Sequence, residues 1–102
     1  MTYVYSDHRL KENVSYNFNG TSRLKQLKPA RFNYIGKTDT TVDGFLAHEA
    51  QSVVPESTNG THNQVDGNGN PIYQIMDYGS LVPLLVKTIQ ELEDRITALE
   101  SA

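Results

Sequence analysis

Apolar residues recur most regularly near the C-terminal end of the chain. Six of them alternate at spacings of three and four residues, namely Val82, Leu85, Ile89, Leu92, Ile96 and Leu99. This spacing lines up apolar side chains along one side of a helix and is the a/d heptad pattern of a coiled coil. The pattern predicts a helix over residues 80–99, with Ser80 as its N-cap and Pro83 in its first turn.

These six residues, called the seam below, have two interpretations. In the first, the helix packs on its own domain, which fits the additional apolar residues Leu81, Leu84 and Val86 in its first half. In the second, the helix associates with other copies, which fits the narrow second half, where Arg95 and Glu100 take g and e positions. Self-association is favoured because the rest of the chain offers little core. Ile at a with Leu at d favours two strands by itself, so the pattern does not separate a dimer from a trimer.

The rest of the chain alternates short strand-like runs with short helix-like runs. Runs of β-branched and aromatic residues predict strands at 2–5, 30–35 and 72–76. Helices are predicted at 7–14, capped by Asp7, at 21–27, capped by Thr21 or Ser22, and at 47–54. Polar turns or loops separate them at 15–20, 36–43 and 56–71. We therefore expect a small α+β domain, mainly helical, with short strands and a long C-terminal helix.

Composition limits what a chain of this size does alone. The 102 residues suffice for one small domain, and only 37% of them are hydrophobic. There is no cysteine, so disulfides, thiolate metal sites and thiol nucleophiles are excluded. A chain this short buries a modest fraction of its surface, so we expect a thin core that oligomerisation supplements. No apolar run approaches the length of a membrane span and the N-terminus lacks a secretory h-region, so no membrane partner is expected.

Charge is distributed unevenly along the chain. Residues 1–37 hold seven Lys or Arg and two Asp or Glu, whereas residues 38–102 hold two and ten. A basic stripe with stacking aromatics is typical of nucleic-acid binding, and the candidates are Arg23, Lys25, Lys28 and Arg31 with Phe32 and Tyr34. The overall pI of about 5.5 is far from that basic footprint. We therefore expect no nucleic-acid partner.

Ser6 and Lys11 are the candidate pair for covalent chemistry. A serine hydroxyl becomes a nucleophile when a neutral lysine accepts its proton, and burial or a nearby cation such as Arg9 deprotonates the lysine. Residues five apart on an ideal helix point about 140° apart. The pair therefore meets only if Ser6 lies before the helix and Lys11 folds back, or across a subunit boundary. From the residues alone, the commoner interpretation is that Ser6 and Asp7 cap a helix.

Metal chemistry has little support in the sequence. The three histidines, His8, His48 and His62, lie far apart and show no ligand spacing. The run from Asp66 to Asn70 resembles the start of a calcium loop, but Pro71 replaces the required glycine and Asp77 the required glutamate. The run is interpreted as a glycine-rich hairpin loop. No metal or cofactor is expected.

Four segments, taken in order, resemble one known family. They are residues 6–14 (SDHRLKENV), 24–34 (LKQLKPARFNY), 44–51 (GFLAHEAQ, followed by Pro55-Glu56) and 77–92 (DYGSLVPLLVKTIQEL). Together they are similar to the C-terminal intramolecular chaperone domain of phage tailspikes and tail fibres, as in endosialidases. The resemblance runs from Ser6 to about Leu99, nearly the whole chain. Its departures are small: His48 stands where Gln is usual, and Ala50 where Val is usual.

The resemblance implies a single-turnover serine peptidase that cuts its own chain. Ser6 is then the nucleophile and Lys11 its base, with Asp7, Arg9 and Glu49 in support, Glu49 by orienting Arg9 or Lys11. Phage members cut at the bond that corresponds to Ser6–Asp7, and other members are assigned the bond before the serine, here Tyr5–Ser6. Attack within one chain favours the second bond, because the serine oxygen reaches the preceding carbonyl through a five-membered ring. The expected bond is nevertheless Ser6–Asp7, because the Ser6 of a neighbouring copy or assistance from Asp7 relieves the ring strain there.

The resemblance also implies a place in a larger protein. Residues 1–5 are then the last strand of an upstream stalk, and residues 6–102 are the chaperone domain, in which the seam forms a homotrimeric coiled coil. The domain helps the β-helical stalk of the same polypeptide to fold and then releases itself. The protein would be made in the host cytoplasm as the precursor of a virion tail component. The alternative is a non-catalytic trimerisation cap that stays attached to a fibre.

Overall fold

The dominant element is the C-terminal helix α3, Val82–Glu100. The computed structural model describes residues 3–102. The helix predicted from residue 80 is therefore confirmed, but Ser80 is not its cap. A 3-10 turn, Tyr78–Leu81, leads into α3, and the Ser80 hydroxyl instead donates to the Asp77 carboxylate at 3.2 Å. Within the described residues, no helix is long and apolar enough to cross a membrane.

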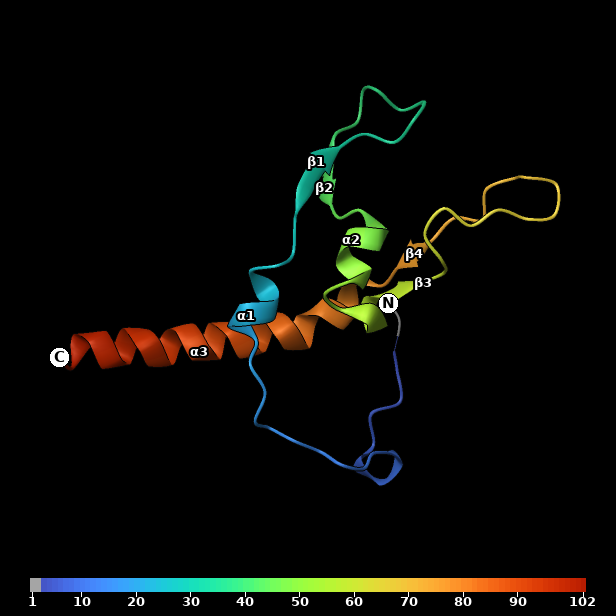
Figure 1. Ribbon diagram of the computed structural model, residues 1–102. Helices are drawn as coiled ribbons and strands as arrows, with labels where there is room; N and C mark the ends of the chain where they lie inside the picture. The colour runs from blue at the N-terminus through green and yellow to red at the C-terminus, as the bar shows by residue number, and fades with distance from the viewer. Residues whose placement is uncertain (1–2) are drawn as a thin grey trace.

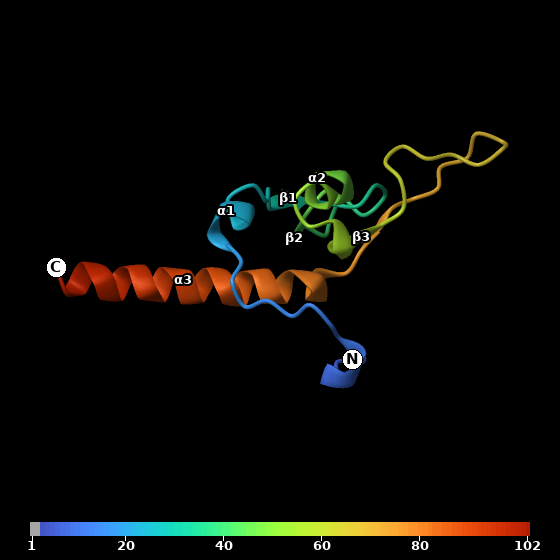
Figure 2. The ribbon, with the colours of Figure 1, turned by 60° about the horizontal axis from the view of Figure 1, so that its bottom comes forward.

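The other elements are short and lie beside the first part of α3, whose C-terminal end extends clear of them (Figures 1 and 2). The remaining helices are α1, Thr21–Leu24, and α2, Ala47–Gln51. One antiparallel pair joins β1, Ala30–Phe32, to β2, Val42–Gly44, and a second joins β3, Thr58–Asn59, to β4, Ile75–Met76. Two further 3-10 turns span His8–Leu10 and Pro55–Ser57. The α+β class is confirmed.

The helix predicted over 7–14 is wrong in extent. The segment forms only the 3-10 turn His8–Leu10, and Asn13 takes the left-handed conformation with φ 54°. Asp7 caps the turn as predicted, because its side chain accepts from the Arg9 backbone N–H. None of the turn residues is buried, and a helix this short does not persist in water without packing.

Most other predicted elements exist but are shorter than expected. The helices expected over 21–27 and 47–54 end at Leu24 and Gln51, and Gly20 rather than Thr21 or Ser22 is the N-cap of α1. The strands expected over 30–35 and 72–76 shrink to β1 and β4. Of the strand expected over 2–5, Thr2 lies outside the described residues and 3–5 form no strand.

Two strands, β2 and β3, were predicted as turn or loop. They are short and polar, so no alternation marks them, and only the pairing with β1 and β4 defines them. The hairpin interpretation of the glycine-rich loop is confirmed by a bridge between Val65 and Pro71. In that loop, Asp66 Oδ1 accepts the N–H groups of Asn68 and Asn70 at 2.8 and 3.0 Å. These bonds lower the pKa of Asp66, the Asn70 contact most.

The hydrophobic core is small and lies between α2 and the start of α3. Its buried apolar residues are Ala50, Val54, Leu81 and Leu84, all at most 5% exposed. Two polar residues are buried with them, and both satisfy their hydroxyls locally. Ser57 donates to the Val54 carbonyl at 2.6 Å, and Thr88 donates to the Leu84 carbonyl at 2.8 Å. The thin core expected from composition is confirmed.

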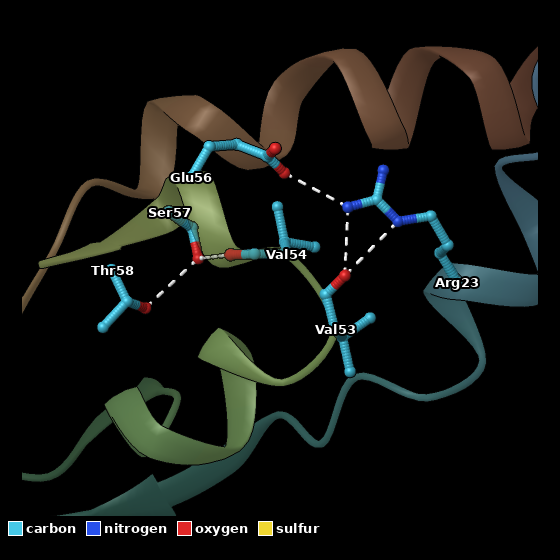
Figure 3. Close-up of polar contacts among 6 residues, drawn as sticks. All are labelled: Arg23, Val53, Val54, Glu56, Ser57 and Thr58. Carbon is cyan, nitrogen blue, oxygen red and sulfur yellow. Dashed lines mark hydrogen bonds and ion pairs between the residues drawn. The ribbon is translucent and has the colours of Figure 1, made fainter. Parts of the chain in front are cut away.

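Arg23 connects α1 to this core, as Figure 3 shows. Its Nε and Nη2 atoms donate to the Val53 carbonyl at 3.3 and 3.0 Å, and Nη2 also donates to Glu56 at 3.1 Å. The Val53 carbonyl follows the end of α2, where backbone acceptors lack partners inside the helix. One guanidinium therefore joins α1, the end of α2 and the Pro55–Ser57 turn.

The single chain exposes far more surface than a compact domain of its mass. A folded monomer of 11.4 kDa is expected to expose about 5,800 Å², whereas this chain exposes 8723 Å². Its radius of gyration is 17.8 Å, against about 13 Å for a compact chain of this length. The excess of about 2,900 Å² is on the order of the area that permanent interfaces bury.

Replacing Leu84 by alanine is expected to lower the free energy of unfolding by about 2–5 kcal/mol, because it opens a cavity in a core of few residues. The control is Ile35→Ala in the β1–β2 loop, where the side chain is fully exposed, with a change within about 0.5 kcal/mol. Urea denaturation at one protein concentration measures both. Equal stability of the two variants would contradict this assignment of the core.

Candidate active site

Ser6 and Lys11 are in direct contact in the structure. Lys11 Nζ donates a hydrogen bond of 2.6 Å to Ser6 Oγ. Ser6 lies before the 3-10 turn and Lys11 directly after it, with Leu10 N and Lys11 N closing the turn onto the carbonyls of Asp7 and His8. The short turn reverses the chain, so residues five apart meet where an α-helix would keep them apart. This is the arrangement that the spacing requires, with Ser6 outside the helix and Lys11 folded back.

Asp7 and Arg9 lock the turn between them. Asp7 Oδ1 accepts the backbone N–H and the Nε of Arg9 at 2.9 and 3.0 Å, and Oδ2 accepts Nη2 at 2.9 Å. The guanidinium contact, and next the backbone N–H, lower the pKa of Asp7, while the carboxylate raises the pKa of Arg9. Both groups are therefore charged at neutral pH and bound to each other. Their role here is to hold the backbone that brings Lys11 back to Ser6.

The whole segment that carries this pair is open to solvent. Residues 3–19 are all exposed, and every hydrogen bond that the structure gives residues 3–14 joins two residues of that segment. Ser6 Oγ and Lys11 Nζ therefore contact each other at a solvent-exposed position of the single chain.

Glu49, predicted to orient Arg9 or Lys11, faces another residue in the single chain. Its Oε2 atom lies 3.9 Å from Lys28 Nζ, and Arg9 is bound to Asp7. Glu49 stands in the first turn of α2, on a different part of the fold from the Ser6 segment. A contact of Glu49 with Arg9 or Lys11 stays a prediction.

The histidines form no metal site within residues 3–102, where no group of three or more potential ligands gathers. Two of them nevertheless meet. The rings of His48 and His62 stack with centroids 4.0 Å apart and planes at 19°. This stack fastens the loop after β3 to α2, a contact that the sequence spacing did not indicate.

Glu91 anchors the segment that follows the site, a role that sequence reasoning missed. Residues 16–21, called the strap below, cross α3. Glu91 Oε1 accepts the Thr21 N–H at 2.8 Å and the Thr21 hydroxyl at 2.6 Å, and Oε2 accepts the Gly20 N–H at 3.0 Å. The hydroxyl contact most of all, then the two N–H groups, lower the pKa of Glu91, and so does the nearby charge of Lys87.

Lys87 and Gly20 complete the strap. Lys87 Nζ donates to the Tyr16 carbonyl at 2.8 Å and lies 5.0 Å from the centre of the Phe18 ring. Gly20 is buried, and a Cβ there would lie 3.0 Å from both the backbone N and Oγ1 of Thr88. Contacts between residues about 70 positions apart leave no local pattern, so the sequence showed only a turn at 15–20.

The seam residues are all left exposed on α3, from 41% at Leu92 to 75% at Leu99. The helix packs on its own domain through Leu84 and Thr88, with Glu91 on the same side. Since each residue advances by about 100°, the seam is centred roughly 100° around the axis from this packed side. The two interpretations of the helix thus concern different faces, and the packed face leaves the seam available.

Acid is expected to loosen the turn that holds Ser6 and Lys11 together. The folded-state pKa of Asp7 lies below its ordinary value of 3.8, so the contact with Arg9 favours the turn at neutral pH. That contribution disappears as the pH falls through the folded-state pKa. A carbon-13 NMR titration should give a midpoint below 3.8 for Asp7, which Arg9→Ala raises and Arg31→Ala, a variant of another ion pair, leaves unchanged. An unshifted midpoint in the native chain would contradict the lock.

Comparison with known proteins supports the interpretation from the first three of the four segments, and the fourth, 77–92, lies outside the match. A search of curated proteins finds no match. A peptidase family model described as chaperone of endosialidase matches residues 6–59, more than half of the chain, and its first matched residue is Ser6. The match includes the Ser6–Lys11 turn, α1, the β1–β2 pair and α2. The chain belongs to the chaperone of endosialidase family.

Proposed function

We propose that the chain is a C-terminal intramolecular chaperone that trimerises, assists the folding of an upstream phage tailspike or fibre stalk, and releases itself by cutting at Ser6. The observation that carries the proposal is the 2.6 Å contact between Lys11 Nζ and Ser6 Oγ, inside the part of the chain that matches the family. A serine that only caps a helix does not need a lysine folded back onto its hydroxyl. The exposed seam supports the assembly part of the proposal.

The chemistry is an acyl transfer followed by hydrolysis. A neutral Lys11 accepts the Ser6 hydroxyl proton as Oγ attacks the carbonyl of the bond to be cut. At Tyr5–Ser6, the attack closes a five-membered ring, the C–N bond breaks, the nitrogen takes a proton, and the acyl group moves to Oγ. Water then hydrolyses the ester and regenerates the hydroxyl. Cleavage at this bond gives a chain that ends at Tyr5 and a domain that begins at Ser6, whereas cleavage at Ser6–Asp7 gives a chain that ends at Ser6 and a domain that begins at Asp7.

Cleavage at Ser6–Asp7, the bond cut in phage members, needs a different source of the nucleophile. Ser6 Oγ reaches its own carbonyl only through a strained four-membered ring. The Ser6 of a neighbouring copy, or assistance from Asp7, removes that strain. We adopt Ser6–Asp7 as the proposed bond on the strength of the family resemblance. The mass of the products decides between the two bonds.

Assembly supplies what the single chain lacks. A lysine acts as a base where burial or a neighbouring cation favours its neutral form, and residues 3–19 are all exposed in one chain. Copies joined through the seam surround these exposed segments with protein and remove water from the lysine. Cleavage then waits for assembly, which is the order a folding template requires. The reaction turns over once on a tethered substrate, so proximity provides much of the rate and modest activation suffices.

The partners follow from the same proposal. The chain associates with two further copies through the seam and with the stalk of the same polypeptide, of which residues 1–5 form the end. The long loop between β3 and β4 extends away from the body of the domain (Figures 1 and 2) and is our candidate for holding the stalk. The product made in the host cytoplasm becomes part of a virion tail, and the domain is released.

The catalytic proposal predicts that a chain with its native upstream stalk splits at one bond beside Ser6. Ser6→Ala and Lys11→Met should stay whole, because each removes one member of the pair. Lys25→Met, which replaces an exposed lysine outside the site, should split like the native chain. Intact mass identifies the fragments and the bond. If Ser6→Ala still splits, the pair is not the nucleophile, and if the native chain stays whole while its stalk trimerises, the domain is a non-catalytic cap.

The assembly proposal predicts that one charge in the seam dissociates the complex. Ile89→Asp should shift the sedimenting species from trimer to monomer, because a carboxylate would be buried among apolar side chains. Gln90→Asp, on the neighbouring exposed position outside the seam, should remain a trimer. Sedimentation equilibrium measures both variants. A monomeric or dimeric native chain would contradict the trimer.

A further inference from the structure

We propose that the strap, residues 16–21, positions the Ser6–Lys11 segment for cleavage, with Glu91 as its principal positioning residue. This inference rests on the proposed function and adds a control on the same site. The first hydrogen bond between the Ser6 segment and α3 is the one from Lys87 to the Tyr16 carbonyl, at 2.8 Å. Within the part of the chain that the structure describes, the residues before Tyr16 make no hydrogen bond to α3.

The strap is built to be firm. Glu91 provides a charged acceptor for two backbone N–H groups and one hydroxyl, and charge-assisted bonds of this kind are stronger than neutral ones. Gly20 passes so close to α3 that a methyl group in its place would lie 3.0 Å from Thr88 atoms. Lys87 adds a bond to Tyr16 and a charge near the Phe18 ring. Four residues of the strap thus contact the part of α3 between Lys87 and Glu91, which is little more than one turn.

The place of the strap around α3 matters for assembly. Lys87 and Glu91 lie on the packed side of the helix or beyond it, away from the seam. The strap therefore crosses α3 without covering the seam, and the Ser6 segment leaves the helix on the side away from the seam. Ser6 is ten residues from Tyr16, so it stays within about 35 Å of that turn of α3. Because the strap joins the Ser6 segment to α3, the packing of α3 against its neighbours in the proposed trimer also determines where each copy places its Ser6–Lys11 pair.

The size of the effect separates two ways in which the strap could act. Without it, the tether that holds Ser6 lengthens from the 10 residues up to Tyr16 to the 17 residues up to Arg23. The longer tether alone lowers the effective concentration of Ser6 at its point of reaction by about twofold. Loss of orientation costs more, since small misplacements lower rates by up to about a hundredfold. A positioning role therefore predicts a fall of about tenfold.

The test uses the full chain with its stalk and compares cleavage rates among molecules shown to be trimeric. Glu91→Ala should cleave about tenfold more slowly than the native chain. Glu91→Gln should fall between them, because its amide oxygen still accepts from Thr21 while its NH2 group opposes the Gly20 N–H. Glu93→Ala, at an exposed position of the same helix, should match the native rate. Intact mass over time gives the rates, and sedimentation gives the trimeric fraction.

A second pair of variants tests the strap without touching its charges. Gly20→Ala forces a methyl group against Thr88 and should slow cleavage, whereas Thr38→Ala, at an exposed position of the β1–β2 loop, should not. If Glu91→Ala trimerises and cleaves within about twofold of the native rate, the strap does not position the site, although the proposed function stands. If Glu91→Ala fails to trimerise, Glu91 is structural and the inference is overturned. If the native chain itself does not cleave, the proposed function has failed, and that result is visible without any variant.

Discussion

The fold depends on one carboxylate that holds the start of a helix too short to stand alone. α1 has four residues, and a helix of that length does not form in water without outside support. Glu91 takes the N–H groups of Gly20 and Thr21 at its start, where helices lack partners of their own. From the same helix, Arg23 reaches the Val53 carbonyl after α2. Through α1, polar contacts over long sequence separations connect parts of the chain that a core of four buried apolar residues could not hold by itself.

The small core also explains why the molecule exposes so much apolar surface. One side of α3 packs on its own domain, and the other side, which carries the whole seam, is exposed. α3 also extends past the elements that pack on it (Figures 1 and 2). In the proposed trimer, the stability of the domain and its association are coupled, so a variant of the core and a variant of the seam both act on the assembled form.

What the sequence predicted, and what it did not, follows the range of the interactions. α3 was predicted from its pattern because a helix of this length repeats its signal over several turns. The contact of Ser6 with Lys11 depends on six consecutive residues. Their spacing alone therefore indicated that the two side chains meet within one chain only if Ser6 lies outside the helix and Lys11 folds back. The ends of α1 and α2, the strands β2 and β3, and the strap were missed or misplaced, because partners 12 to 71 residues away determine them. The membership of the family came from four ordered segments rather than from any single residue.

The open position of the site is what a reaction of the chain on itself requires. A nucleophile that met a dry, finished site in the single chain would cut the polypeptide before the stalk had folded, and the template would be lost too early. Here Ser6 and Lys11 are already in contact, and both are exposed in the single chain. The short turn held by Asp7 and Arg9 keeps Ser6 and Lys11 together, and the strap joins their segment to α3. Under the proposed function, this arrangement makes assembly, rather than synthesis of the chain, the event that sets the time of cleavage.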